Sequence, residues 1–68
     1  MIVEIRKVGP TKYGNYALFN AVFDNGLVVS GIASYKDFSL EEKKTYKDLY
    51  LRQFQRRDGS FGYSLFKK

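Results

Sequence analysis

The sequence predicts an all-β fold, a small β-barrel with the element order β-β-β-α-β-β. Five short segments are rich in β-branched and aromatic residues, which is typical of strands in a small barrel. The dipeptides Asn25-Gly26 and Asp58-Gly59 follow two of these segments, and such dipeptides favour tight hairpin turns. Ser39 opens a segment in which acids precede lysines, as they do at the start of a helix. With 68 residues, the chain is expected to form one domain, residues 1–68.

The first three strands are expected at Ile2–Val8, Tyr16–Phe23 and Leu27–Ala33. The segment Gly9–Asn15 is expected to be a loop, because Gly, Pro and Asn cluster in it. Gly31 lies inside the third strand and predicts a bulge or a sharp bend, as the corner of a barrel requires.

A short helix is expected at Leu40–Lys47. The hydroxyl of Ser39 can accept hydrogen bonds from the first free amides of this helix, and Glu42 can reach back to the cap. Two further strands are expected at Leu49–Arg57 and Phe61–Lys67, joined by a hairpin turn.

The fourth expected strand carries aromatic and cationic side chains in alternation on one face, namely Tyr50, Arg52, Phe54 and Arg56. Its other face begins with Leu49 and Leu51 but continues with two glutamines, so the sequence leaves open which face is buried. With a two-residue turn, Phe54 lies opposite Tyr63 and Arg56 opposite Phe61, whereas a three-residue loop shifts this pairing.

The loop Thr11-Lys12-Tyr13-Gly14-Asn15-Tyr16 is similar to the Thr/Lys-x-Gly-x-x-Tyr loop of small phage- or plasmid-type OB-fold proteins that coat single-stranded DNA. The element order is also that of the OB-fold. The resemblance covers the element order over most of the chain and these six residues of motif. It implies an OB-like barrel, single-stranded DNA binding, and a role in DNA replication or recombination.

The composition favours an anionic partner. Twelve basic and seven acidic side chains give a net charge of +5, and six Tyr and six Phe are more aromatic rings than so small a barrel easily buries. The chain has no His and no Cys, so the commonest general base and the thiolate nucleophile are missing. We therefore expect no enzyme, no metal site, no cofactor and no small-molecule substrate.

The chain shows no sign of membrane insertion or secretion. No apolar run reaches the roughly 18 residues that a membrane span needs. The first residues carry Glu4 and lack a basic region followed by an apolar one, unlike a secretory signal. We expect a cytoplasmic protein without a membrane partner.

These observations predict sequence-tolerant binding of single-stranded DNA or RNA, with DNA favoured. Basic side chains neutralise phosphates and aromatic rings stack on bases. The predicted nucleic-acid-binding residues are Lys7, Lys12, Tyr13, Tyr16, Tyr50, Arg52, Phe54, Arg56 and Arg57.

Two other interpretations use the same features. In the first, the aromatic face is a docking patch of a small protein-interaction module, such as a phage-encoded inhibitor of a host protein, since Tyr and Arg are also favoured at protein interfaces. In the second, the protein binds duplex DNA non-specifically. A homodimer is expected in any case, because a chain this short buries only about 60% of its unfolded surface and has no disulfide to stabilise it.

Overall fold

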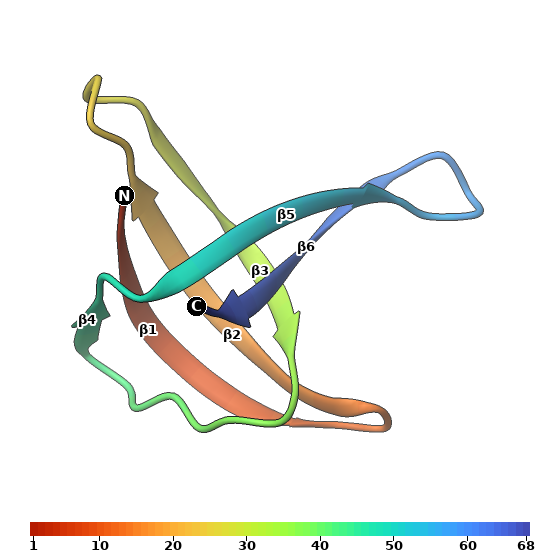
Figure 1. The fold of residues 1–68 in the computed structure, drawn as a ribbon. Coiled ribbons are helices and arrows are strands. Elements are labelled where there is room, and N and C mark those ends of the chain that lie inside the picture. Colours follow the sequence, from red (N-terminus) through yellow and green to blue (C-terminus); the bar gives the residue numbers. More distant parts are fainter.

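The computed structural model describes residues 1–68 and consists of one six-stranded sheet (Figure 1). The strands are β1 Ile2–Thr11, β2 Gly14–Val22, β3 Val28–Tyr35, β4 Lys44–Tyr46, β5 Leu49–Gln55 and β6 Phe61–Lys67. Their order in the sheet is β4-β1-β2-β3-β6-β5. The pair β3 and β6 is parallel, and all other neighbours are antiparallel. The all-β prediction is confirmed, and the five expected strands correspond to β1, β2, β3, β5 and β6.

The expected helix at Leu40–Lys47 is wrong, because this segment is a loop followed by the short strand β4. Positions three, four and seven residues after Leu40 are all lysines, so a helix here has no apolar stripe to bury. The Ser39 cap does not form either, and the carboxylate of Glu42 instead accepts a hydrogen bond from the backbone N–H of Val8 (3.0 Å). The structure contains no helix that could span a membrane.

The sheet is open rather than closed into a barrel. No strand pairing joins its two edge strands, β4 and β5. These edges are nevertheless consecutive in the chain, separated only by Lys47 and Asp48. The backbone N–H of Lys68 donates to the carbonyl oxygen of Asp48 (2.9 Å), which ties the end of β6 to this link. Figure 1 shows β5 crossing over the face of β2 and β3, so the sheet curls around its own core.

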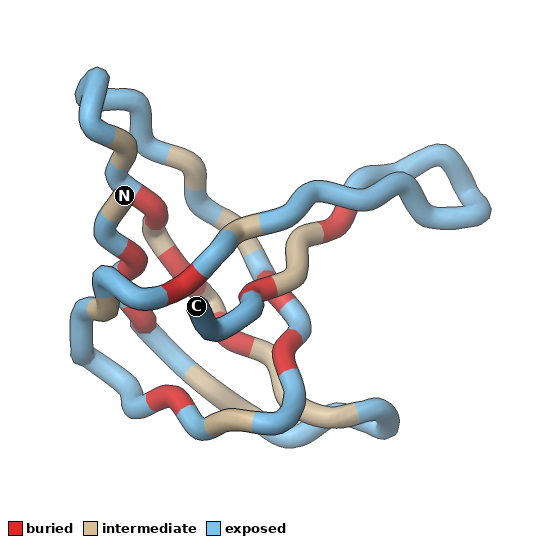
Figure 2. Tube along the Cα trace, viewed as in Figure 1, coloured by how far each residue is buried: buried red, intermediate tan, exposed pale blue.

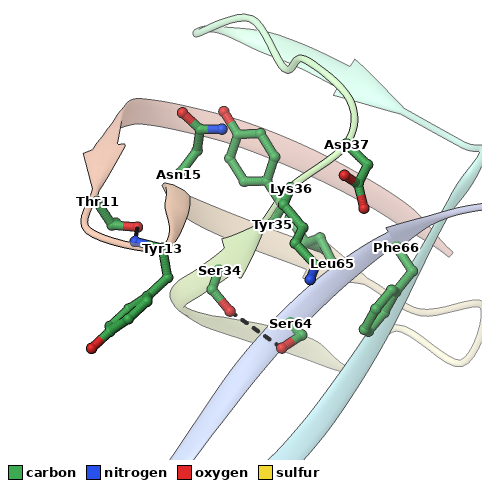
Figure 3. Close-up of a pocket in the computed structure, with 10 residues that line it drawn as sticks. All are labelled: Thr11, Tyr13, Asn15, Ser34, Tyr35, Lys36, Asp37, Ser64, Leu65 and Phe66. Carbon is green, nitrogen blue, oxygen red and sulfur yellow. Dashed lines mark hydrogen bonds between the residues drawn. The ribbon is translucent and has the colours of Figure 1, made fainter.

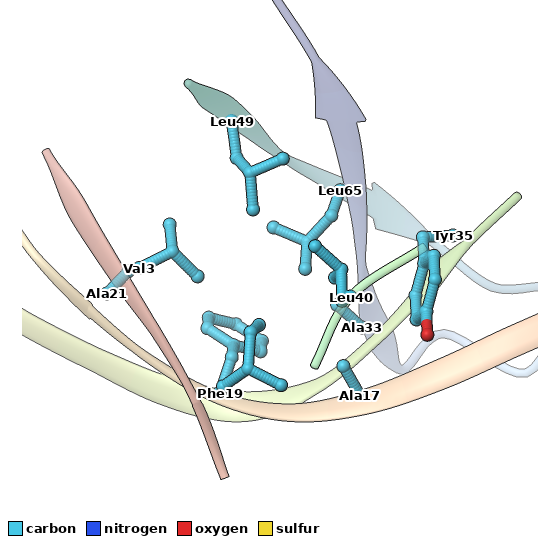
Figure 4. Close-up of a cluster of buried hydrophobic side chains, with 10 residues drawn as sticks. Val3, Ala17, Phe19, Ala21, Ala33, Tyr35, Leu40, Leu49 and Leu65 are labelled. Carbon is cyan, nitrogen blue, oxygen red and sulfur yellow. The ribbon is translucent and has the colours of Figure 1, made fainter. Parts of the chain in front are cut away.

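The core lies inside this curl (Figures 2 and 4). Its ten buried residues are Val3, Ile5, Ala17, Phe19, Ala21, Ala33, Tyr35, Leu40, Leu49 and Leu65. Leu40 comes from the loop where the helix was expected, and its side chain is buried in the core although its segment is irregular. The rings of Phe19 and Tyr63 meet edge to face with centres 5.4 Å apart, which connects β2 to β6.

A β-bulge interrupts β1 rather than β3. Ile5 pairs with Phe19 and Lys7 with Leu18, so Arg6 is the extra residue. Of the two alternatives expected at Gly31, the bulge is wrong, because β3 passes this position in regular register with β2. The bulge places Lys7 on the outer face of the sheet, opposite Leu18.

Candidate nucleic-acid interface

The tip of the β5–β6 hairpin is a three-residue loop that projects from the sheet (Figure 1). The N–H of Arg56 donates to the carbonyl of Ser60 (2.7 Å), and the N–H of Gly59 donates to the carbonyl of Arg56 (3.0 Å). Gly59 has φ 89°, the left-handed conformation that closes such loops. The hydroxyl and backbone N–H of Ser60 donate to the Asp58 carboxylate and hold the pKa of Asp58 below its usual value.

The third loop residue shifts the register of the hairpin by one position. Phe54 lies opposite Gly62. The expectations that Phe54 faces Tyr63 and that Arg56 faces Phe61 are therefore wrong, as is the placement of Phe61 and Tyr63 on the face of the arginines. A shift of one residue exchanges the two faces of a strand.

The structure also identifies the buried face of β5. Leu49 is buried in the core and Leu51 packs against it, opposite Leu65, so the aromatic and cationic face points outward. On that face the exposed fractions are 54% for Tyr50 and 42% for Phe54. We call this surface the cation–aromatic stripe and define it as Tyr50, Arg52, Phe54, Arg56, Phe66 and Lys68.

Each of the three rings in the stripe has a cation close to it. The guanidinium carbon of Arg52 lies 5.9 Å from the ring centre of Phe66, that of Arg56 lies 5.6 Å from Phe54, and Nζ of Lys68 lies 5.3 Å from Tyr50. Exposed pairs of this kind contribute about 0.5–1 kcal/mol each. The stripe therefore presents positive charge and aromatic surface in alternation.

Arg56 is the most firmly held cation of the stripe. Its Nη1 donates to the carbonyl oxygen of Phe61 (2.6 Å), and its guanidinium lies beside the Phe54 ring over Gly62. The side chain of Arg52, in contrast, makes no hydrogen bond or ion pair within the protein, and neither does that of Arg57 at the tip. These two arginines keep their full capacity to bind an external anion.

One row of paired residues crosses five strands on the outer face. Gly9 pairs with Tyr16, Tyr16 with Ser34, Ser34 with Ser64, and Ser64 with Arg52. The hydroxyl oxygens of Ser34 and Ser64 are 3.3 Å apart, so both side chains lie on the same face. A Cβ at Gly9 would lie 2.5 Å from the Tyr16 ring, which shows that Tyr16 covers this glycine and is half-buried.

The connection between β1 and β2 is tighter than expected. The segment Gly9–Asn15 is not a loop, because Thr11 pairs with Gly14 and only Lys12 and Tyr13 remain unpaired. The N–H of Tyr13 donates to Oγ1 of Thr11 (3.2 Å), while the Tyr13 ring is 86% exposed. The side chains of Lys12 and Tyr13 therefore project from the end of a hairpin.

The nine predicted residues fall into three groups. The stripe contains Tyr50, Arg52, Phe54 and Arg56. The outer face of β1 and β2 carries Lys7 and Tyr16. The two hairpin ends carry Lys12, Tyr13 and Arg57. The structure thus brings four of them into one surface and leaves the others on neighbouring strands or turns.

Sequence reasoning missed Phe66 and Lys68 as members of the stripe. Phe66 lies opposite Tyr50 and is 44% exposed. The missing step was the register, because pairing the apolar residues Leu51 and Leu65 on the inner face would have placed Phe66 outside. The alternation of side chains along Phe61–Lys67 contained this information, because Leu65 and Phe66 must lie on opposite faces of the strand.

Comparisons with protein-family models, with curated proteins and with solved structures find no match to this chain. The candidate interface is therefore interpreted from its own geometry. That geometry is an exposed strip of rings and cations that continues into a row of small polar side chains on β6 and β3.

Proposed function

We propose that this protein binds single-stranded nucleic acid, DNA in the first instance, without strong sequence preference. The observation that supports this most directly is the cation–aromatic stripe, where three exposed rings each have a cation beside them. Aromatic rings stack on bases of any sequence, and cations along the same surface follow the phosphate backbone. The net charge of +5 draws such a ligand to the protein.

We assign phosphate binding to the two arginines whose side chains make no hydrogen bond or ion pair in the protein. Arg52 lies in the middle of the stripe and Arg57 lies at the projecting tip, and neither makes an ion pair. Each phosphate that they neutralise releases counterions from the strand. Affinity is therefore expected to fall steeply as the salt concentration rises.

We assign base stacking to the rings. Tyr50 and Phe66 lie opposite each other in the register of β5 and β6 and therefore side by side on the outer face. The guanidinium of Arg52 lies over the Phe66 ring, so a base on this side stacks on the guanidinium plane, which accepts bases as aromatic rings do. Stacking contributes about 1–3 kcal/mol per base and tolerates any sequence.

The resemblance to OB-fold proteins supports the same location. OB-folds bind oligonucleotides on the face of strands two and three and with the loops after strands one and four. The corresponding places here are the outer face of β2 with Tyr16, the β1–β2 turn with Lys12 and Tyr13, and the β5–β6 tip with Arg57. We propose an OB-like arrangement left open between β4 and β5, in a cytoplasmic protein that coats strands during replication, as phage proteins of this type do.

The direct test is a titration with an oligothymidylate and with a duplex, each at low and at moderate salt. The chain has six Tyr and no Trp, so tyrosine emission reports binding. Quenching by the single strand, weaker quenching by the duplex and loss of both at higher salt are expected. Absence of any response at low salt would rule out nucleic acid as the ligand, and preference for the duplex would favour the non-specific duplex binder.

Variants separate the two parts of the mechanism. Y50A is expected to lose about 1–3 kcal/mol of binding free energy, while Y50F keeps the ring and most of the affinity. R52A is expected to reduce the slope of log affinity against log salt by about 0.7. K47A, on the exposed link between β4 and β5, is the matched control. Affinity is measured with a fluorescently labelled oligonucleotide, because these variants change the number of tyrosines. If Y50A folds and binds with unchanged affinity, the stacking mechanism is contradicted.

A second candidate function is protein docking, and one observation favours it. Val22 pairs with both Ile2 and Val28, so three exposed apolar side chains form a row across β1, β2 and β3. Such a row suits a protein partner, either a target protein or a second copy in a homodimer. This interpretation predicts no response to oligonucleotides, together with a concentration-dependent mass in sedimentation for the homodimer.

A further inference from the structure

A pocket of about 470 Å³ lies where the parallel strands β3 and β6 separate (Figure 3). These strands pair only at Ala33 with Tyr63 and at Ser34 with Ser64. Beyond that point the chain continues into Lys36 on one side and into the end of β6 on the other, and the β1–β2 turn closes the end of the gap. Its volume falls within the range of small-molecule sites, about 300–1,000 Å³.

Aromatic rings stand on opposite sides of this pocket. Figure 3 shows Tyr13, from the β1–β2 turn, on one side and Phe66, from β6, on the other. Tyr35 forms the inner wall and belongs to the core. The linked hydroxyls of Ser34 and Ser64 lie between these two rings in Figure 3. The pocket therefore offers an aromatic ring at either side of a small polar surface, which suits a ligand with an aromatic ring and polar edges.

Three polar side chains of the pocket, those of Asn15, Lys36 and Asp37, have no hydrogen-bond or ion-pair partner within the protein, whereas the hydroxyls of Thr11, Ser34 and Ser64 do. The half-buried side-chain amide of Asn15 makes no intramolecular hydrogen bond, although an amide offers both a donor and an acceptor. Lys36 and Asp37 also line the pocket and take part in no ion pair. These groups can pair with a base edge and with a phosphate without breaking an existing interaction.

The pocket is continuous with the cation–aromatic stripe. Phe66 belongs to both, and Ser64 lines the pocket while it lies directly opposite Arg52 on β5. A nucleic-acid strand that follows the stripe from the hairpin tip therefore reaches the pocket after it has passed Arg52 and Phe66.

We propose that this pocket receives one unstacked nucleobase of the bound strand, held between Tyr13 and Phe66, with its edge toward Asn15 and its phosphate toward Lys36. This proposal rests on the proposed function and adds to it a defined nucleotide site at one end of the stripe. The Asp37 carboxylate disfavours a second phosphate beside it and can accept a hydrogen bond from a base N–H, such as N3–H of thymine.

The test uses two probes, thymidine monophosphate and a labelled oligothymidylate, with ¹⁵N-labelled full-length protein. The monophosphate is expected to shift the Asn15 side-chain amide and the backbone amides of Lys36 and Ser64 in a saturable way. For the oligothymidylate, Y13A is expected to bind about tenfold more weakly and Y13F to recover most of that loss. K36A is expected to weaken binding as well, and K47A serves as the lysine control.

The outcomes separate this site from the stripe. If the oligonucleotide binds but Y13A and K36A bind it as tightly as the wild type and the pocket amides do not shift, the pocket proposal is overturned and the stripe stands. If the monophosphate shifts the pocket amides while the oligonucleotide fails to bind, the pocket is a site for free nucleotides, and both the proposed function and the binding of a strand's base in the pocket are overturned. If neither probe binds, both are overturned. Because Tyr13 is almost fully exposed, Y13A is expected to fold normally.

Discussion

The ring of Phe54 lies across Gly62 of the neighbouring strand, with the guanidinium of Arg56 5.6 Å from the ring centre. A Cβ at Gly62 would lie 2.7 Å from Phe54 Cζ and 2.7 Å from Nη2 of Arg56. The glycine therefore makes room for the aromatic ring and its cation at the end of the stripe that leads to the tip. Aromatic cover of a strand glycine compensates for the packing that the missing side chain cannot supply.

The first prediction concerns this relationship. G62V is expected to displace the Phe54 ring and the Arg56 guanidinium, because a β-branched side chain occupies their place. Both neighbours are ends of flexible side chains, so the fold is expected to persist with a stability change of about 1 kcal/mol or less. Loss of the ring-current shift on the Arg56 side-chain protons measures the displacement. S64V, two residues further on the same face, is the control, and an unchanged Arg56 shift in G62V would contradict the prediction.

The turn residues alone do not determine the register that creates this contact, although pairing Leu51 with Leu65 on the inner face gives it. Asp58-Gly59 fits a two-residue turn as well as the first part of a three-residue loop, and the two differ only in whether Arg56 pairs with Ser60. The strands themselves could be predicted, because their alternation and turn residues are local signals. The side-chain partners across β5 and β6 depend on one hydrogen bond at the tip.

In the segment after β3, the local sequence signal predicted the wrong structure. The local signal at Ser39 and Glu42 favours a helix, but an isolated helix of eight residues with Leu40 as its only aliphatic residue is unstable. Tyr46 pairs with Val3 instead and extends the sheet by β4. Pairing with a distant strand decided the structure here, and nothing in the segment itself identifies that partner.

The second prediction concerns Gly14, which brings the β1–β2 turn close to the end of β3. Its φ is 152°, and a Cβ there would lie 2.9 Å from the carbonyl oxygen of Tyr35. G14A is therefore expected to destabilise the fold by about 1–3 kcal/mol through clash and strain. Gly26 has φ 88°, and a Cβ there would have no atom within 4 Å. G26A is therefore the matched control, in which only the cost of placing an alanine at positive φ applies. Urea unfolding of G14A and G26A measures the difference, and equal losses would show that the contact with Tyr35 is unimportant.

The third prediction concerns alkaline pH. Burial raises the pKa of the Tyr35 phenol above its ordinary value of 10.0, an effect that a hydrogen bond with the Leu40 backbone partly offsets. The neutral phenol thus stabilises the fold at pH below the pKa of the unfolded chain, and this contribution is lost as the pH rises through the folded-state pKa. Y35F has no phenol to ionise, so its unfolding free energy is expected to fall less than that of the wild type above pH 10.0.

Denaturant unfolding across this pH range provides the measurement. When the folded protein is titrated with alkali, the absorbance of tyrosinate should rise in a step at higher pH than that of the other tyrosines. This step should be missing in Y35F and present in Y13F. Parallel loss of stability in the wild type and in Y35F would show that Tyr35 ionisation does not limit stability at high pH.

The fourth prediction concerns the carboxylate that replaces the expected helix cap. Glu42 accepts a hydrogen bond from the backbone N–H of Val8, at the point where the pairing of β1 with β4 has ended. E42A removes this acceptor and leaves the N–H to water, so a loss of about 0.5–1.5 kcal/mol is expected. The neighbouring Glu41 instead forms an exposed ion pair with Lys44 (2.9 Å), and such pairs contribute about 0–1 kcal/mol.

Hydrogen exchange distinguishes the two glutamates at a single amide. In E42A the Val8 amide is expected to exchange faster than in the wild type, whereas in E41A its rate should follow global stability alone. Faster exchange of Val8 in both variants to the same extent would mean that the loop as a whole protects β1. A selective effect in E42A would establish that this one carboxylate takes the place of a β4 partner along the edge of β1, because no strand covers that edge beyond Ile5.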